Sequence, residues 1–208
     1  MFAAASEQGL AEGAVLLRRF AAGVAERLLD ALQPIVAEAA WRHMLTPGGL
    51  RMSVAMTNCG PLGWVSDRRG YRYSATDPLT GRPWPPMPEA FRTLAANAAA
   101  AAGYPGFEPD ACLVNRYEPG ARLSLHQDRD ERDPGHPIVS VSLGLPAVFL
   151  FGGARRSDKA QRIGLVHGDT VVWGGASRLH HHGVLALAEG RHALTGSCRI
   201  NLTLRRAG

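Results

Sequence analysis

One short segment of the chain, LSLHQDRDE at residues 123–131, carries residue types that bind metal ions. His126 and Asp128 are separated by one residue, so in a β-strand their side chains project to the same face. An imidazole and a carboxylate side by side are two of the three ligands of a 2-His-1-carboxylate site, which leaves metal positions open for other ligands. A polar surface strand can have the same spacing, so the pair alone does not decide between the two.

The third ligand of such a site must come from another part of the chain. SRLHHHGVL at residues 177–185 offers three adjacent histidines, His180, His181 and His182. A histidine-rich strand well downstream of the first pair favours a metal site over a polar surface. Three adjacent histidines are also compatible with a weak metal site on the surface, so chemistry alone leaves the third ligand open.

The final segment of the chain, CRINLTLR, alternates polar and apolar residues as a strand does. Its polar face holds Arg199, Asn201, Thr203 and Arg205. Two guanidinium groups on a buried face need an anionic partner, because an unpaired buried charge is costly. Arginine pairs bidentately with carboxylates, so a dicarboxylate co-substrate fits this face. The alternative is a solvated edge strand that ends the chain.

The segments that must position these side chains are short and rich in β-forming residues. Asn115 and Tyr117 alternate in LVNRYEPG, so an amide and a phenol face one way. Strand-like runs occupy residues 111–117, 138–144, 147–151, 161–166, 169–175, 180–187 and 198–205. Many short strands separated by turn residues indicate a closed or two-sheet β structure.

The N-terminal half has a mixed α/β pattern. Its predicted elements are a strand over residues 14–20, a helix over 22–40 and a helix over 88–103. Pro34 is expected to kink or split the first helix. Residues 41–87 are loop-rich, apart from one alternating stretch at residues 51–57.

These elements predict one domain over residues 13–208, preceded by a flexible arm at residues 1–12. Its catalytic core would be a jelly roll at residues 110–208. Residues 13–109 would form an N-terminal α/β layer packed on that core, with a lid for substrate recognition.

Composition excludes several classes of protein. The chain has 208 residues, 46% of them hydrophobic and 20% charged, with a net charge of +5. Its three cysteines are far apart, which excludes a disulfide scaffold and a CxxC zinc site. No apolar run is long enough for a membrane span, and the N-terminus lacks the pattern of a signal peptide. We therefore expect a soluble, monomeric cytoplasmic protein with no membrane partner, whose basic character is compatible with nucleic acid.

Four motifs taken together resemble one known family: LVNRYEPGARLSLHQDRDE, IVSVSLGLPAVFLFGG, HGDTVVWGGASRLHHHGV and CRINLTLR. They are similar to motifs of the AlkB family of iron(II)- and 2-oxoglutarate-dependent dioxygenases. The likeness continues upstream through TPGGLRMSVAMTNCGPLGW and YRY, and covers nearly the whole chain from about residue 13. The resemblance implies the double-stranded β-helix fold of that family, in agreement with the jelly roll expected above. It also implies Fe(II), 2-oxoglutarate and O2 as cofactor and co-substrates.

The resemblance assigns roles to the residues already singled out. It makes His126, Asp128 and His182 the iron ligands, because the family's distal histidine immediately precedes the glycine that is Gly183 here. His180 and His181 stand where aromatic residues are usual in close relatives, and we expect them outside the metal site. The residues expected to bind 2-oxoglutarate are Asn115, Tyr117, Arg199, Asn201 and Arg205. Of these, Arg199 is expected to hold the distal carboxylate. Asn115, Asn201 and Arg205 are expected to hold the other carboxylate end and the geometry on the iron side.

For the nucleic-acid substrate, the resemblance implies a flipped base stacked on an aromatic ring. Trp64 would provide that ring, and Asp130 would approach the methylated base as a catalytic-site carboxylate. The other expected substrate contacts are Tyr71 and Tyr73 at the phosphates or base edge, Arg156 in the base pocket, and Thr46 and Met56 in the groove. Leu50 stands where a close relative carries an aromatic residue.

The function implied is direct-reversal repair of alkylated bases by oxidative demethylation. The expected lesions are 1-methyladenine and 3-methylcytosine in DNA, single-stranded in preference to double-stranded, and in RNA, with formaldehyde and succinate released. The alternative within enzymes is a dioxygenase of the same fold that acts on a modified tRNA, a protein side chain or a small molecule. A metal-sensing β-barrel module is a third hypothesis, but such a module would not need the two arginines of the last strand.

Overall fold

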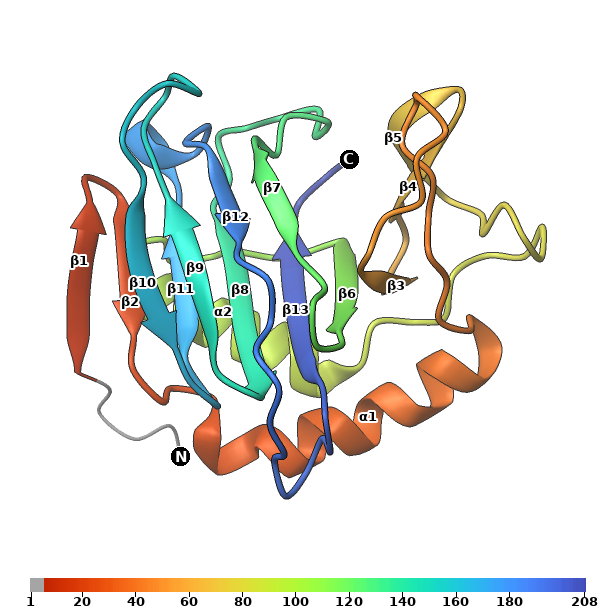
Figure 1. Ribbon diagram of the computed structural model, residues 1–208, viewed down its shortest axis with the longest axis horizontal. Coiled ribbons are helices and arrows are strands. Elements are labelled where there is room, and N and C mark those ends of the chain that lie inside the picture. Colours follow the sequence, from red (N-terminus) through yellow and green to blue (C-terminus); the bar gives the residue numbers. More distant parts are fainter. Residues whose placement is uncertain (1–5) are drawn as a thin grey trace.

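The computed structural model describes residues 6–208, which form two β-sheets packed face to face, a separate hairpin and two long helices (Figure 1). The larger sheet has the strand order β1 (Glu7–Ala11), β2 (Ala14–Leu17), β11 (Thr170–Trp173), β8 (Ile138–Gly144), β13 (Arg199–Arg205), β6 (Ala111–Tyr117) and β3 (Ala55–Cys59). The smaller sheet has the order β10 (Gln161–Leu165), β9 (Ala147–Phe151), β12 (His182–Val184) and β7 (Leu123–His126). The hairpin consists of β4 (Gly63–Asp67) and β5 (Gly70–Ser74). All these strand pairs are antiparallel, which confirms the expected jelly roll.

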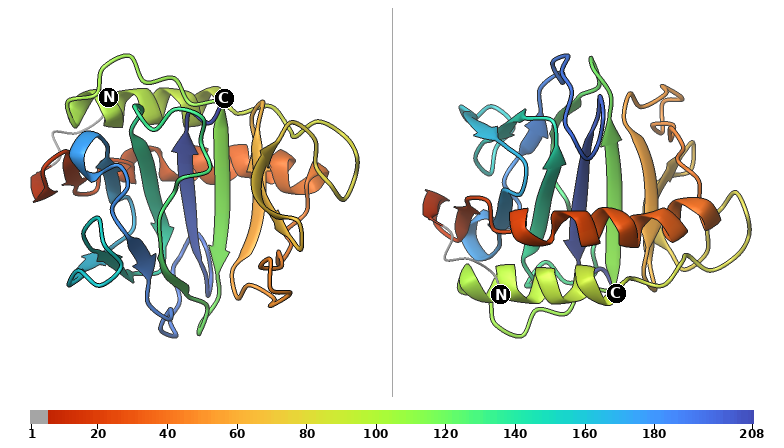
Figure 2. Two further views of the ribbon diagram at one scale, coloured as in Figure 1. Left: turned by 90° about the horizontal axis from the view of Figure 1, so that it is seen from above. Right: turned by 90° about the horizontal axis from the view of Figure 1, so that it is seen from below.

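Two helices cover the outer face of the larger sheet, α1 (Ala25–Glu38) and α2 (Glu89–Ala101) (Figure 2). Both bury one apolar side, as their spacing predicts, and α2 begins directly after Pro88. The expected split at Pro34 is wrong, because α1 continues through this residue. Pro34 is exposed while Leu32 and Ile35 beside it are buried, so packing of the apolar side outweighs the hydrogen bond that proline cannot donate.

The predicted N-terminal arm needs a correction. Residues 7–11 form β1, which pairs with β2 at the edge of the larger sheet; residues 1–5 lie outside the described residues. The alternating stretch expected at residues 51–57 becomes a strand only at β3, four residues later than expected. Three N-terminal strands, β1, β2 and β3, thus belong to the larger sheet. Hydrogen bonds of one sheet therefore join the two parts that we expected to divide at residue 110.

The space between the two sheets is apolar at one end and polar at the other. Phe149, Phe151 and Trp173 pack there with aliphatic side chains from both sheets. The alternation predicted for the last strand is confirmed: Ile200, Leu202 and Leu204 of β13 face the helices, and its polar side chains face the smaller sheet. This polar end contains the candidate site. Among the described residues, no helix has the length and apolar character to cross a membrane.

Candidate active site

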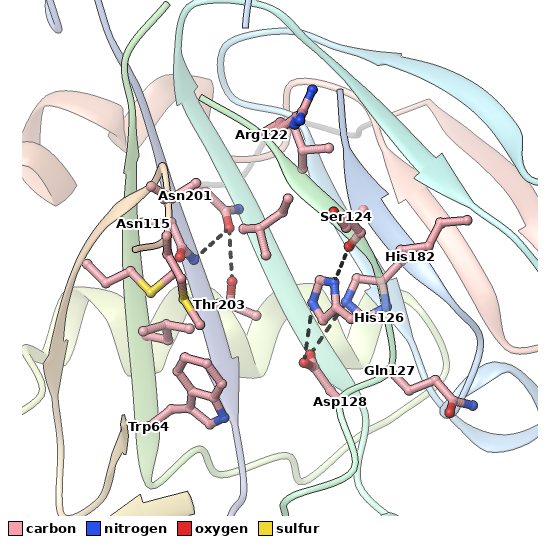
Figure 3. A pocket seen from close by; sticks show the side chains of 18 of the residues that line it. Trp64, Asn115, Arg122, Ser124, His126, Gln127, Asp128, His182, Asn201 and Thr203 are labelled. Atoms are coloured by element: carbon pink, nitrogen blue, oxygen red, sulfur yellow. Dashed lines mark hydrogen bonds and ion pairs between the residues drawn. The ribbon is translucent and has the colours of Figure 1, made fainter. Parts of the chain in front are cut away.

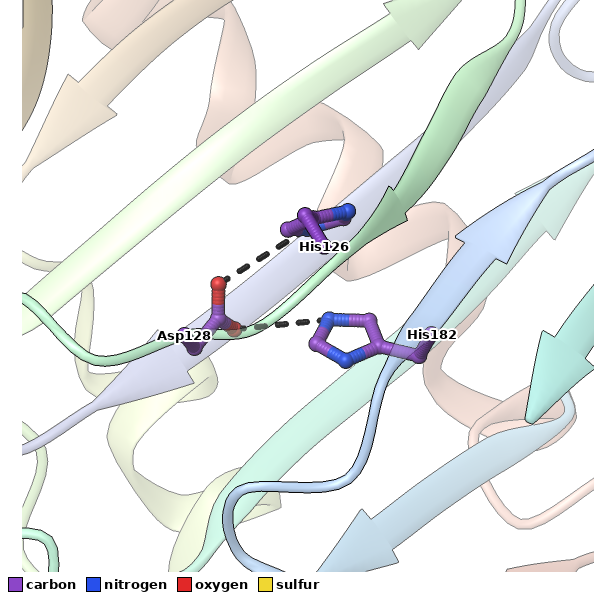
Figure 4. A group of neighbouring side chains, drawn as sticks. All are labelled: His126, Asp128 and His182. Carbon is purple, nitrogen blue, oxygen red and sulfur yellow. Dashed lines mark ion pairs between the residues drawn. The ribbon is translucent and has the colours of Figure 1, made fainter. Parts of the chain in front are cut away.

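Three side chains that could hold a metal ion meet between β7 and β12, and we call them the metal-binding cluster (Figure 4). His126 ends β7, Asp128 follows it, and His182 begins β12 directly opposite His126. The Nε2 atoms of His126 and His182 lie 3.8 and 3.6 Å from the two carboxylate oxygens of Asp128. One ligand atom from each residue lies within 4.8 Å of the others. The arrangement fits a 2-His-1-carboxylate metal centre with open positions for other ligands.

The hydrogen bonds of the two histidines leave Nε2 free to bind a metal ion. Nδ1 of His126 lies 2.8 Å from the carbonyl oxygen of Ser124, and Nδ1 of His182 lies 3.1 Å from that of His180. A carbonyl oxygen only accepts, so each Nδ1 carries the proton and each Nε2 keeps its lone pair. Partners of this kind fix the ring orientation of metal-binding histidines.

Close packing of the two strands explains the glycine after His182. A Cβ atom on Gly183 would lie 2.7 Å from the carbonyl oxygen of Leu123, so a larger residue would push β12 away from β7. Phe149 and Trp173 pack against the ring of His182 from behind, at 6.0 and 4.9 Å between ring centroids. The strands and the aromatic wall therefore hold this ligand in place.

Buried charges set the protonation of the ligands. Burial disfavours a charged Asp128, but the permanent charge of Arg205 beside it outweighs this and holds its pKa well below the usual range. Nε and Nη2 of Arg205 donate to Oδ2 of Asp128 at 3.0 and 2.6 Å. Burial, together with the nearby His126, lowers the pKa of His182 to about 3. An ionised carboxylate and a neutral imidazole are the forms that bind a metal.

Arg199 is the residue that fits an anionic co-substrate. It is 1% exposed, and its Nη2 donates to Oγ of Ser142 at 2.8 Å. Its Nε and Nη1 find no hydrogen-bond partner among the described residues. Its guanidinium carbon lies 5.0 Å from the centre of the Tyr117 ring, and burial lowers its pKa. A buried guanidinium with two unused donors fits a carboxylate, so the donor set suits 2-oxoglutarate.

The two asparagines predicted beside it are joined to each other (Figure 3). Asn115 donates to Oδ1 of Asn201 at 3.4 Å, and Asn201 donates to Oγ of Ser140 at 2.9 Å. Oδ1 of Asn115 is buried and unpartnered among the described residues. Arg205 lines the same cavity, and its guanidinium donates to the carboxylate of Asp128, which agrees with its expected part in the geometry on the iron side.

All these groups open into one cavity of about 740 Å³. Its lining includes most of the residues predicted to contact the substrate, namely Thr46, Met56, Trp64, Tyr71, Asp130 and Arg156. Trp64 stacks on Tyr71 with 5.6 Å between ring centroids, and its Nε1 donates to Asp130 at 2.8 Å. Leu50, which is 73% exposed, lies on the same rim. An aromatic pair and a carboxylate therefore stand at the mouth of the cavity.

Tyr73 is not placed with this group. It is absent from the described lining of the cavity, and its hydroxyl donates to Glu131 at 2.8 Å. Burial raises its pKa well above the ordinary value. The direct contact with phosphate or base that we expected of Tyr73 therefore stays a prediction.

His180 and His181 lie beside the metal-binding cluster without joining it. In the part of the chain that the structure describes, the cluster consists of His126, Asp128 and His182. His181 lines the cavity and approaches the carbonyl oxygen of Gly153, whereas the ring of His180 packs on Phe151. The choice among three adjacent histidines thus agrees with the geometry.

Three polar residues at the site, Ser142, Glu131 and Arg178, were missed from the sequence. Ser142 accepts from Arg199, and Glu131 forms buried ion pairs with Arg178 and Arg205. Ser142 had a usable signal, because it alternates with apolar residues in IVSVSLG. Glu131 had none, since it stands in an acidic run that reads as solvent-exposed.

Comparisons with known proteins agree with this geometry. The sequence profile of the 2OG-Fe(II) oxygenase superfamily matches residues 13–205. The chain is 59% identical to the alpha-ketoglutarate-dependent dioxygenase AlkB of Escherichia coli over 202 residues, 97% of this chain and 94% of the relative. It is 48% identical to the AlkB homolog of Caulobacter vibrioides over 86% of this chain and 80% of the relative.

A solved structure supports the same assignment. That of OsALKBH1 matches 97% of this chain and 100% of its own, with a TM-score of 0.81 and 30% identity. The matches cover the strands that carry the metal-binding cluster and Arg199. The chain therefore belongs to the AlkB family within the 2OG-Fe(II) oxygenase superfamily, and it is a dioxygenase that depends on Fe(II) and 2-oxoglutarate.

Proposed function

We propose that this dioxygenase repairs alkylated nucleic acid by oxidative demethylation of its bases. One observation carries the proposal: the metal-binding cluster, the unpaired Arg199 and the aromatic mouth open into a single cavity. A metal ion, a dicarboxylate and a methylated base can thus meet there. The relatives named AlkB, and the mouse relative named nucleic acid dioxygenase ALKBH1, which is 34% identical over 59% of this chain, support a nucleic-acid substrate.

In this proposal, His126, Asp128 and His182 hold Fe(II). Arg199 binds one carboxylate of 2-oxoglutarate in a site shielded from water, with Tyr117 against its guanidinium. Asn115 and Asn201, which are hydrogen-bonded to each other, line the same cavity. With iron bound, one oxygen atom of O2 goes to the methyl carbon, and the other goes to 2-oxoglutarate, which loses CO2 and becomes succinate. The hydroxymethyl group formed on the base nitrogen then leaves as formaldehyde.

The mouth of the cavity would select the base. Trp64 and Tyr71 offer a stacking surface for a base taken out of its stack. Asp130 places a carboxylate beside that surface. Methylation at N1 of adenine or N3 of cytosine leaves the base cationic near neutral pH, so a fixed negative charge favours these lesions over undamaged bases. Arg51, Arg122, Arg129 and Arg156 line the same cavity and suit phosphates.

The test is formaldehyde release from oligonucleotides that carry one 3-methylcytosine, measured with and without 2-oxoglutarate. We expect release only when Fe(II), 2-oxoglutarate and the lesion are all present, and more from single strands than from duplexes. A methylated tRNA, a methylated peptide and free methylated nucleoside form the comparison set. Faster turnover on the peptide or the nucleoside than on every oligonucleotide would contradict the proposal.

A further inference from the structure

The β4–β5 hairpin is fastened to the metal-binding segment at two adjacent points. Trp64 of β4 and Tyr73 of β5 are directly opposed in the hairpin, so their side chains share one face. Trp64 donates to Asp130, and the Tyr73 hydroxyl donates to Oε1 of Glu131. The acceptors are consecutive residues that follow Asp128 by two and three positions. One face of the hairpin is therefore hydrogen-bonded to the segment that follows Asp128.

Glu131 does more than accept this hydrogen bond. Its side chain is 2% exposed, and its two oxygens lie 3.0 Å from Nη2 of Arg178 and 3.3 Å from Nε of Arg205. The same Nε of Arg205 also donates to Asp128. Arg178 donates in addition to the backbone carbonyl oxygens of Asp128 and His136, at 2.7 and 2.9 Å. Asp128 is thus held at its side chain and its backbone by two arginines that Glu131 joins.

The charges of this cluster balance only if Glu131 is counted. Two carboxylates, the partly buried Asp128 and the buried Glu131, face two buried guanidinium groups, Arg178 and Arg205. Without the charge of Glu131, the cluster would carry one excess positive charge beside the position of the cation. Arg205 would then neutralise Asp128 alone, and the carboxylate would bind a cation less strongly.

We propose that Glu131 is a positioning residue, which acts through Arg205 and Arg178 to keep Asp128 oriented for metal binding and which offsets the positive charge beside it. The role ties the hairpin at the cavity mouth to the metal site through the hydroxyl of Tyr73. It rests on the proposed function, because it takes His126, Asp128 and His182 as the metal ligands. Substitution of a residue that hydrogen-bonds to a metal ligand, or orients it, commonly lowers metal affinity or activity by about 10- to 100-fold.

The test is a titration with Mn²⁺ in the absence of turnover, which measures metal affinity apart from activity. Glu131→Gln keeps the shape of the side chain and removes its charge, and we expect Mn²⁺ affinity to fall by about 10- to 100-fold. Glu131→Asp keeps the charge and should restore most of the affinity. Affinity of Glu131→Gln within twofold of the wild type, or equal losses in both variants, would overturn the proposal.

Asp77 provides a matched control. It is a buried carboxylate paired with Arg42, and it lies outside the described lining of the cavity. Asp77→Asn should lower the melting temperature and leave Mn²⁺ affinity unchanged. A loss of affinity in Asp77→Asn equal to that in Glu131→Gln would assign the effect to general loosening and contradict our proposal.

A second variant keeps the test decisive if Glu131→Gln does not fold. Tyr73→Phe preserves the ring and removes only the hydroxyl that donates to Glu131. We expect a smaller loss of Mn²⁺ affinity than in Glu131→Gln, and a larger relative change in kcat than in the KM for 2-oxoglutarate. Wild-type values for both would refute the link through Glu131. If Asp128→Asn abolishes Mn²⁺ binding while the Glu131 variants retain it, the metal site stands and only this inference fails.

Discussion

At the inner end of the cavity, most of the side chains proposed to bind metal and co-substrate stand on strands of the two packed sheets, and Asp128 lies two residues beyond β7. Strands β12 and β13 are each paired on both sides, and His182 and Arg199 are nearly inaccessible. At the mouth, Trp64 and Tyr71 stand on a two-stranded sheet of their own, and Tyr71 is exposed. An isolated hairpin has little stability of its own. Reactive groups are thus fixed by sheet pairing, whereas recognition depends on a hairpin that a few side-chain contacts hold.

The largest effects should come from the inner end. Changing His126 or His182 to Ala, or Asp128 to Asn, should abolish formaldehyde release and metal binding while the fold survives, because each ligand fixes part of an otherwise open site. His180→Ala and His181→Ala should retain substantial activity. Circular dichroism and a metal titration on each variant check both statements. If His181→Ala is as inactive as His126→Ala, His182 is the wrong third ligand.

The next effect concerns the co-substrate. Arg199→Ala should raise the KM for 2-oxoglutarate by about tenfold or more, since a hydrogen bond to a charged group contributes about 1.5–3 kcal/mol. Arg199→Lys should restore only part, because a point charge does not replace the planar fork. In addition, 2-oxoglutarate with Mn²⁺ should raise the melting temperature of the wild type more than that of Arg199→Ala. Unchanged 2-oxoglutarate kinetics in Arg199→Ala would move the carboxylate site elsewhere.

At the mouth, the charge of Asp130 should matter for cationic lesions. Asp130→Ala should lower kcat/KM for 3-methylcytosine and 1-methyladenine by about ten- to a hundredfold, in line with about 1.5–3 kcal/mol for a charge-assisted contact. The loss for neutral 1-methylguanine should be much smaller. Both lesion types are measured in the same oligonucleotide, which separates the charge effect from backbone binding. An equal loss on both would leave Asp130 a structural role only.

The smallest effect should come from the hydrogen bond that joins Trp64 to Asp130. Trp64→Phe keeps an aromatic stacking surface and removes the indole N–H, so we expect a change of roughly two- to tenfold in KM for the oligonucleotide. The KM for 2-oxoglutarate should stay at the wild-type value. A rise in both constants would show that the mouth and the inner end are less separate than their sheets indicate.

Much of the inner end could be predicted from local patterns. Strand alternation placed Asn115 and Tyr117, and the polar residues of β13, on the side that faces the cavity. The spacing of His126 and Asp128 indicated a metal site, and the cluster contains both. These predictions succeed because strand geometry alone decides which side chains share a face.

The contacts that depend on distant parts of the chain could not be predicted. Arg205 bonds with Asp128, and Tyr73 with Glu131, across segments whose relative position follows only from the packed fold. The burial of Glu131 contradicts its polar sequence neighbourhood for the same reason. Likewise, Pro34 remains helical because Leu32 and Ile35 pack against the sheet beneath α1. The local preference of proline does not include this packing.

The central claim is that one cavity brings together a metal ion, 2-oxoglutarate and a methylated base. Its most direct measurement is the ratio of formaldehyde to succinate formed on a single-stranded oligonucleotide with one 3-methylcytosine. Our account predicts a ratio near one for the wild type and a ratio well below one for Asp130→Ala. This variant keeps the co-substrate site intact but binds the methylated base less strongly. Succinate formed at the same rate with and without the lesion, and no formaldehyde, would contradict it.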